Sequence, residues 1–164
     1  MAAGRWWVRV LQFLGGGFVI AAGLLCASAQ ESATGRIIKV LPQFLDLKGR
    51  HTLSPSLYER DAYQYHLRQN PQERSGLRFA VQFKLKHASS ATVRLRLELR
   101  GSAQTNTPNE LVLETPVKEG HWWTQWTELT LTGARYQQFG ELTAWRATLW
   151  QHDRLLSEQK SFLW

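Results

Sequence analysis

Two alternating stretches in the middle of the chain decide the fold: Leu77-Arg78-Phe79-Ala80-Val81-Gln82-Phe83-Lys84-Leu85 and Val93-Arg94-Leu95-Arg96-Leu97-Glu98-Leu99. Successive side chains of a β-strand point to opposite faces, so the odd-numbered apolar residues of each stretch share one face. This period of two predicts two strands that each cover a core on one side. The short segment 87–91 between them predicts an antiparallel hairpin.

On the N-terminal and C-terminal sides of this pair, the sequence predicts further strands over residues 37–42, 111–117, 122–132, 142–151 and 155–164. Segments rich in Gly, Pro, Ser and Asn separate them, as expected for turns. Pro42 closes the first strand, and a proline within a sheet indicates an edge or a bulge. We therefore expect about seven strands in a mainly β, two-sheet antiparallel sandwich.

One helix is expected, over about residues 55–69, inserted after the first strand. Either Ser56 and Glu59 form a capping box, or Ser54 caps a helix that has Pro55 at its first position. The helix should end before Asn70-Pro71. Its apolar residues Tyr58, Ala62 and Tyr65 recur at i, i+4 and i+7. Such a stripe can lie on a sheet or cover its edge.

A single domain over residues 36–164, after a short leader at 30–35, accounts for these elements. Trp145-Arg146-Ala147-Thr148-Leu149 forms an aromatic-led penultimate strand, which a tight turn and a closing strand follow. In this architecture the chain resembles immunoglobulin and fibronectin type III domains, although the immunoglobulin Cys…Trp…Cys pattern is missing. The run Leu53-Ser54-Pro55-Ser56-Leu57-Tyr58-Glu59-Arg60-Asp61-Ala62-Tyr63-Gln64 is similar to uncharacterised secreted bacterial proteins, a resemblance that implies no function.

The N-terminus has the pattern of a secretory signal peptide. Arg5 and Arg9 precede an uncharged stretch at residues 10–29, which ends on the small residues Ala27-Ser28-Ala29. We expect cleavage after Ala29 and a secreted or periplasmic chain. The alternative is an uncleaved membrane anchor at residues 10–29. A lipoprotein signal is not expected, because Leu24-Leu25, and no small residue, precede Cys26.

Composition limits the function classes. Cys26 is the only cysteine, so cleavage would leave neither a disulfide nor a thiol nucleophile. The formal net charge is +7, or +5 without residues 1–29, which contain two arginines and no acid. A basic exported protein meets envelope polymers, lipid headgroups or acidic proteins more readily than nucleic acid. No cofactor is predicted, and a membrane would be contacted only through an uncleaved N-terminal segment.

Six cations form the first candidate site, an anion-binding face on the polar side of the expected hairpin: Arg78, Lys84, Lys86, Arg94, Arg96 and Arg100. If His87 and Ala91 lie opposite each other, Lys84 faces Arg94, and such like-charge pairs are mildly destabilising. Either this is a solvated face relieved by acids on a neighbouring strand, or it is a basic stripe that binds an anionic surface.

Aromatic residues form the second candidate site. Leu129 and Leu131 set the inward parity of their strand, which directs Trp123 to the core and Trp122 and Trp126 outward unless a bulge intervenes. The two outward tryptophans would suit a stacking platform for sugar rings or would pack at an edge.

Catalysis has little support in the sequence. The five histidines His51, His66, His87, His121 and His152 are scattered, and no metal-binding or nucleophile motif is present. The leading hypothesis is a non-enzymatic module that binds another macromolecule, most simply a protein, through the tyrosine-rich helix (Tyr58, Tyr63, Tyr65). A carbohydrate-binding module that uses Trp122 and Trp126 is the alternative, and an enzyme with a site assembled from scattered residues is the second alternative.

Overall fold

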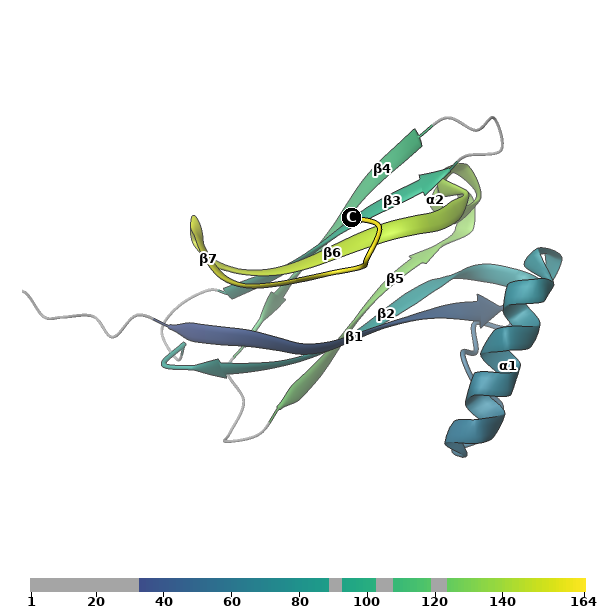
Figure 1. Ribbon diagram of the computed structural model, residues 1–164, viewed down its shortest axis with the longest axis horizontal. Coiled ribbons are helices and arrows are strands. Elements are labelled where there is room, and N and C mark those ends of the chain that lie inside the picture. Colours follow the sequence, from purple (N-terminus) through teal and green to yellow (C-terminus); the bar gives the residue numbers. More distant parts are fainter. Residues whose placement is uncertain (1–32, 89–92, 103–107, 119–123) are drawn as a thin grey trace, which may run out of the picture. The chain divides into compact units, whose positions relative to one another are not determined.

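A computed structural model describes residues 33–88, 93–102, 108–118 and 124–164. The predictions for the signal peptide, for Ala27 and Ala29, and for Trp122 and Trp123 lie outside these residues. Seven described strands form two antiparallel sheets (Figure 1). Sheet A has the order β1-β2-β5, and sheet B has the order β4-β3-β6-β7.

The strands have the following bounds: β1 Thr34–Asp46, β2 Arg74–Lys86, β3 Val93–Ser102, β4 Pro108–Val117, β5 Gln125–Thr132, β6 Glu141–Gln151 and β7 Arg154–Lys160. The predicted mainly β sandwich with a helix after its first strand is confirmed. The finer resemblance to immunoglobulin and fibronectin type III domains stays a prediction.

The core lies between the two sheets, and the inward faces are those that the alternation predicts. Phe79 and Val81 of β2 and Leu95 and Leu97 of β3 have no exposed side-chain surface. Leu149 of β6 is equally buried. Because burial of such side chains is the main favourable term in folding, this interface between the sheets holds the domain together.

The predicted hairpin between β2 and β3 is wrong. β2 pairs with β1 and β5 in sheet A, whereas β3 pairs with β4 and β6 in sheet B. The connection therefore passes from one sheet to the other. Both arrangements bury the same apolar residues, because the two strands meet one core from opposite sides, so the alternation could not distinguish them.

Helix α1 (Leu57–Gln69) lies beyond the ends of β1 and β2 (Figure 1), and it ends before Asn70 as predicted. Ser56 is its N-cap residue but makes no side-chain cap hydrogen bond, so the predicted capping box is not formed. A single 3-10 turn, η1 (Pro71–Glu73), leads from the helix into β2.

The prediction of only one helix is also wrong, because α2 (Gly133–Phe139) joins β5 to β6. Gly133 and Gly140, with φ of 63° and 80°, occur at its two ends. Phe139 is fully buried over Gly101 of β3, where an added Cβ would lie 2.7 Å from the phenylalanine ring. The helix has only seven residues, too few for a helical period to stand out in the sequence.

Arg74, the first residue of β2, connects α1 to both sheets. Its guanidinium donates to the carbonyl oxygens of Leu67 and Arg68 at the end of α1, and to both oxygens of Glu141 in β6 at 2.8 and 3.0 Å. The same group lies 4.0 Å from the ring centroid of Phe44 in β1. Only 2% of the Arg74 side chain is exposed. One side chain thus satisfies the free carbonyls of a helix end and joins sheet A to sheet B.

Replacing Arg74 should detach α1. Arg74→Met leaves two helix carbonyls without donors, so we expect the unfolding free energy to fall by about 2–4 kcal/mol. Arg74→Lys keeps the charge but loses the planar fork, and should recover only part of that loss. Urea denaturation measures the stability, and amide hydrogen exchange measures the protection of α1. Unchanged protection of α1 in Arg74→Met would contradict this role.

Candidate functional site

Polar contacts on one side hold α1 in place. The Asp46 carboxylate, at the end of β1, accepts hydrogen bonds from the backbone N–H groups of Lys48 and Arg50 at 2.9 and 2.8 Å. It also accepts from Arg50 Nε at 2.9 Å and from the Tyr63 hydroxyl of α1 at 2.8 Å. Burial disfavours the ionised carboxylate, but the bonds from Arg50, Tyr63 and Lys48 outweigh it and lower the pKa of Asp46 to about 2.

Gln64 of α1 provides a second anchor. Its carboxamide oxygen accepts from the Phe44 N–H at 2.7 Å, and its Nε2 donates to the carbonyls of Phe44 and His51 at 3.0 and 2.8 Å. Leu67 completes this side of the helix and is fully buried. The inward side of α1 is therefore built from Tyr63, Gln64 and Leu67.

The predicted stripe of α1 faces the other way. Tyr58 and Tyr65 are 84% and 63% exposed, Ala62 between them is exposed, and Leu57 in the first turn is 66% exposed. By helical spacing, Tyr58, Ala62 and Tyr65 lie opposite the anchored side, and Leu57 adds exposed apolar surface in the first turn. We call these four residues the α1 outer surface. The suggestion that the stripe covers the sheet is wrong, because polar groups of Tyr63 and Gln64 anchor the helix instead. Of the three predicted interface tyrosines, Tyr63 faces inward.

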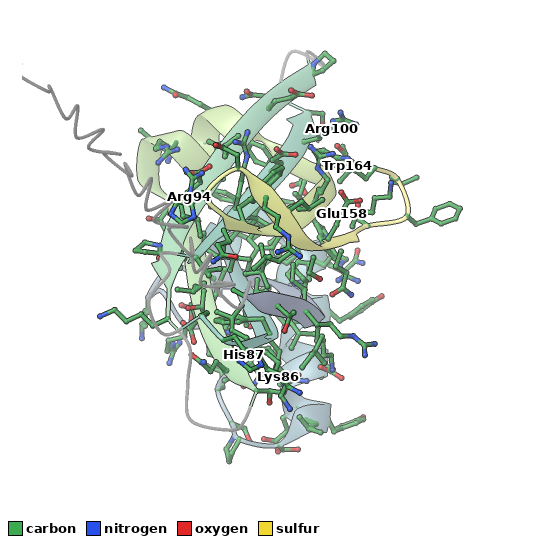
Figure 2. The ribbon with its side chains drawn as sticks, turned by 90° about the vertical axis from the view of Figure 1, so that its left-hand side faces the viewer. Lys86, His87, Arg94, Arg100, Glu158 and Trp164 are labelled. Carbon is green, nitrogen blue, oxygen red and sulfur yellow. The ribbon has the colours of Figure 1, made fainter. Side chains whose placement is uncertain are left out.

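The predicted basic face is split between the two sheets. Figure 2 shows Lys86 and Arg94 on different sheets. On sheet B, cross-strand neighbours carry opposite charges, since Arg96 pairs in register with Glu114 and Arg100 with Glu110. Arg96 Nε lies 2.9 Å from Glu98 Oε1, and Arg100 Nε lies 3.1 Å from Glu110 Oε1. On the outer face of sheet B, arginines thus lie beside glutamates that form ion pairs with them.

Trp164 covers part of this charged face of sheet B. Trp164 lies beside Arg100 (Figure 2), with the Arg100 and Arg146 guanidinium carbons 4.0 and 4.8 Å from its ring centroid. Cation–π contacts of this kind stabilise a ring on a charged surface. The segment returns over β6 through Ser161, whose Oγ accepts from the Trp145 N–H at 3.0 Å. Phe162 and Leu163 remain exposed.

An open cleft of about 340 Å³ lies at the other end of this face, lined by Arg94, Arg96, Glu114, Trp150, His152 and Asp153. Glu114 contacts both arginines, with its carboxylate oxygens 3.7 Å from Arg94 Nη1 and 3.4 Å from Arg96 Nη1. The arginines and carboxylates of the cleft are equal in number, so it has no excess of positive charge.

The outer face of sheet A differs from that of sheet B in its charges. Besides Arg78, the outer face of sheet A carries four cations, Arg36 and Lys39 on β1 and Lys84 and Lys86 on β2, together with Trp126 on β5, which is 49% exposed. We call these five residues the sheet A basic face. Trp126 points outward as predicted. Arg36 and Lys39 were not among the predicted residues, because only the pairing of β1 with β2 places them there.

The sixth predicted cation, Arg78, also lies on sheet A but is paired. It donates to Glu128 of β5, with Nε 2.9 Å from Oε2, and to the amide oxygen of Gln43. The hydrogen bond from Arg78 lowers the pKa of Glu128. Burial and the nearby Arg78 charge lower the pKa of His51. Arg78 is therefore part of a structural cluster.

No family model, curated protein or solved structure matches this chain. Within the described parts of the chain, no cluster of three or more His, Cys, Asp or Glu residues is arranged to hold a metal ion. None of the helices described here is both long and apolar enough to cross a membrane.

The contribution of Asp46 to the unfolding free energy should depend on pH. Its pKa in the folded chain, about 2, lies below the ordinary value of 3.8. The ionised carboxylate therefore stabilises the fold fully above about pH 4, and this contribution is lost as the pH falls towards 2. We expect Asp46→Asn to lower the unfolding free energy by about 1–2 kcal/mol at pH 7.

Urea denaturation at pH 7 and at pH 3 measures this difference, which should be smaller at the lower pH. Asp61→Asn is the control, since the Asp61 side chain is 74% exposed; its effect should stay below about 0.5 kcal/mol at both pH values. An equal effect of Asp46→Asn at both pH values would contradict the assignment.

Proposed function

We propose that this chain is a secreted or periplasmic, non-enzymatic binding module whose partner is a protein with an apolar groove that receives helix α1. One observation carries the proposal: the apolar stripe of α1 faces solvent while polar contacts fix the opposite side. Tyr58 and Tyr65 are two helical turns apart, a spacing typical of a helix that binds in a groove.

The anchoring of the helix supports this role. Arg74 holds the end of α1, and Asp46 and Gln64 hold its inward side, so the exposed tyrosines are presented on a fixed support. Tyrosine combines a large apolar ring with a polar hydroxyl and is enriched in protein interfaces. A fixed helix loses little conformational entropy when it binds.

Photo-crosslinking tests the proposal. A crosslinking amino acid at position 58 or 65 of the exported chain should capture one and the same protein, identified by mass spectrometry. Tyr58→Ser combined with Tyr65→Ser should lower the affinity for that purified protein by at least about tenfold, because interface tyrosines often contribute more than 1 kcal/mol each. The unfolding free energy should change by less than about 0.5 kcal/mol.

Phe162→Ser is the matched control, because Phe162 is a fully exposed aromatic residue away from α1. It should leave the affinity unchanged. Equal losses in both variants would refute a specific role for the α1 outer surface. Crosslinks between two copies of this chain, with no other protein, would replace the proposed partner by self-association.

Export has a separate test. If residues 1–29 are a cleaved signal, the intact mass of the chain recovered from outside the cytoplasm should correspond to a chain that begins at Gln30. An intact N-terminus in a membrane fraction would support the anchored alternative instead.

A further inference from the structure

We propose that the sheet A basic face binds an acidic polysaccharide, whose charged groups contact Arg36, Lys39, Lys84 and Lys86 and one of whose sugar rings stacks on Trp126. This site is separate from the α1 outer surface and does not depend on the function proposed for it. Three observations carry the inference: the unpaired charges, their register, and the exposed indole beside them.

The first observation is that these four cations have no counter-charge among the residues that the structure describes. Sheet B matches each of its outward arginines on β3 with a glutamate, and Arg78 on sheet A has Glu128. Arg36, Lys39, Lys84 and Lys86, in contrast, form no ion pair with any residue of the described ranges. Within the described residues, the outward arginines of β3 are thus paired with acids, whereas this part of sheet A presents four cations without an ion pair. Such a surface attracts anionic ligands and speeds their association.

The second observation is the register. Arg36 lies directly opposite Lys84, an arrangement of like charges that destabilises a sheet. A bulge between Ile37 and Lys39 brings Lys39 opposite Gln82, so that β1 presents two cations on this face. Folding stability alone would not select this arrangement. A ligand that neutralises these charges would explain why like-charged residues lie opposite each other here.

The third observation is Trp126. It pairs in register with Gln82, and it therefore lies in the same cross-strand row as Lys39. Gln82 Nε2 donates to Thr124 Oγ1 at 2.9 Å, which places an amide and a hydroxyl beside the indole. An aromatic ring stacks on the C–H face of a sugar, and amide and hydroxyl groups bind its hydroxyls.

These features favour a glycan over other polyanions. A lipid surface is usually met by the apolar side of an amphipathic helix, whereas this face is the side of a β-sheet. Single-stranded nucleic acid is held by several aromatic side chains in succession, and Trp126 is the one outward aromatic of the described part of sheet A. The export predicted from residues 1–29 would also bring the chain into contact with envelope or extracellular polymers.

Binding of the mature chain, residues 30–164, to immobilised polygalacturonate and chondroitin sulfate tests the proposal. We expect binding to at least one of them at about 20 mM salt that weakens strongly at about 200 mM salt, because exposed charges are screened. Neutral dextran should not bind. Arg36→Glu combined with Lys84→Glu should lower the affinity at least about tenfold.

The matched control is Arg135→Glu combined with Arg154→Glu. This variant changes the net charge by the same amount as Arg36→Glu with Lys84→Glu. Its two positions are exposed and lie in α2 and β7, away from this face. We expect a loss of less than about threefold. Trp126→Ala should weaken binding about tenfold with unchanged urea denaturation, and Trp126→Phe should restore part of the loss.

Four results would overturn the proposal. They are no binding of either polymer at low salt, equal losses in the two charge-reversal variants, no effect of Trp126→Ala, and tighter binding to anionic vesicles or single-stranded DNA than to the glycans. Because none of these variants alters α1, its crosslinking through position 58 should persist, which separates failure of this site from failure of the protein interface.

Discussion

The guanidinium of Arg74 is the constraint on which the arrangement of this domain depends. It reaches the end of α1, the ring of Phe44 in sheet A and the carboxylate of Glu141 in sheet B. Burial raises the pKa of Tyr136 in α2, and Arg74, as a neighbouring hydrogen-bond partner, partly offsets this shift. A buried cation needs partners on every side, so the segments that supply them are held together.

That constraint explains how a weakly apolar helix keeps a fixed position. The α1 helix buries only Leu67 fully. Its other inward contacts are hydrogen bonds with defined geometry, through Tyr63 and Gln64. Directional bonds fix the orientation of a helix more narrowly than an apolar contact of the same size would. The outward side is therefore free to carry apolar residues without losing the position of the helix.

Local patterns could predict the strands but not their partners. The inward faces of β2 and β3 follow from a period of two, which each strand displays by itself. Their assignment to opposite sheets depends on pairing with β1, β4, β5 and β6, about which a local period carries no information. The same holds for the candidate site on sheet A. The alternation in the sequence predicts that Lys84, Lys86 and Trp126 point outward, but only the register of β1 with β2 places Arg36 and Lys39 on the same face. The anchored side of α1 could not be predicted from an apolar pattern, because its contacts through Tyr63 and Gln64 are polar.

The contact between Gln64 and Phe44 has a further consequence, which concerns the free edge of sheet A. The carboxamide of Gln64 occupies both the N–H and the carbonyl of Phe44, as a neighbouring strand would. Pro42 has no N–H to offer, and Ser157 of β7 takes the N–H of Ile37. An incoming strand would therefore find these backbone groups of β1 already bonded or, at Pro42, lacking the N–H. These contacts lower the tendency of this edge to pair with another strand, which matters beside a helix that exposes apolar residues.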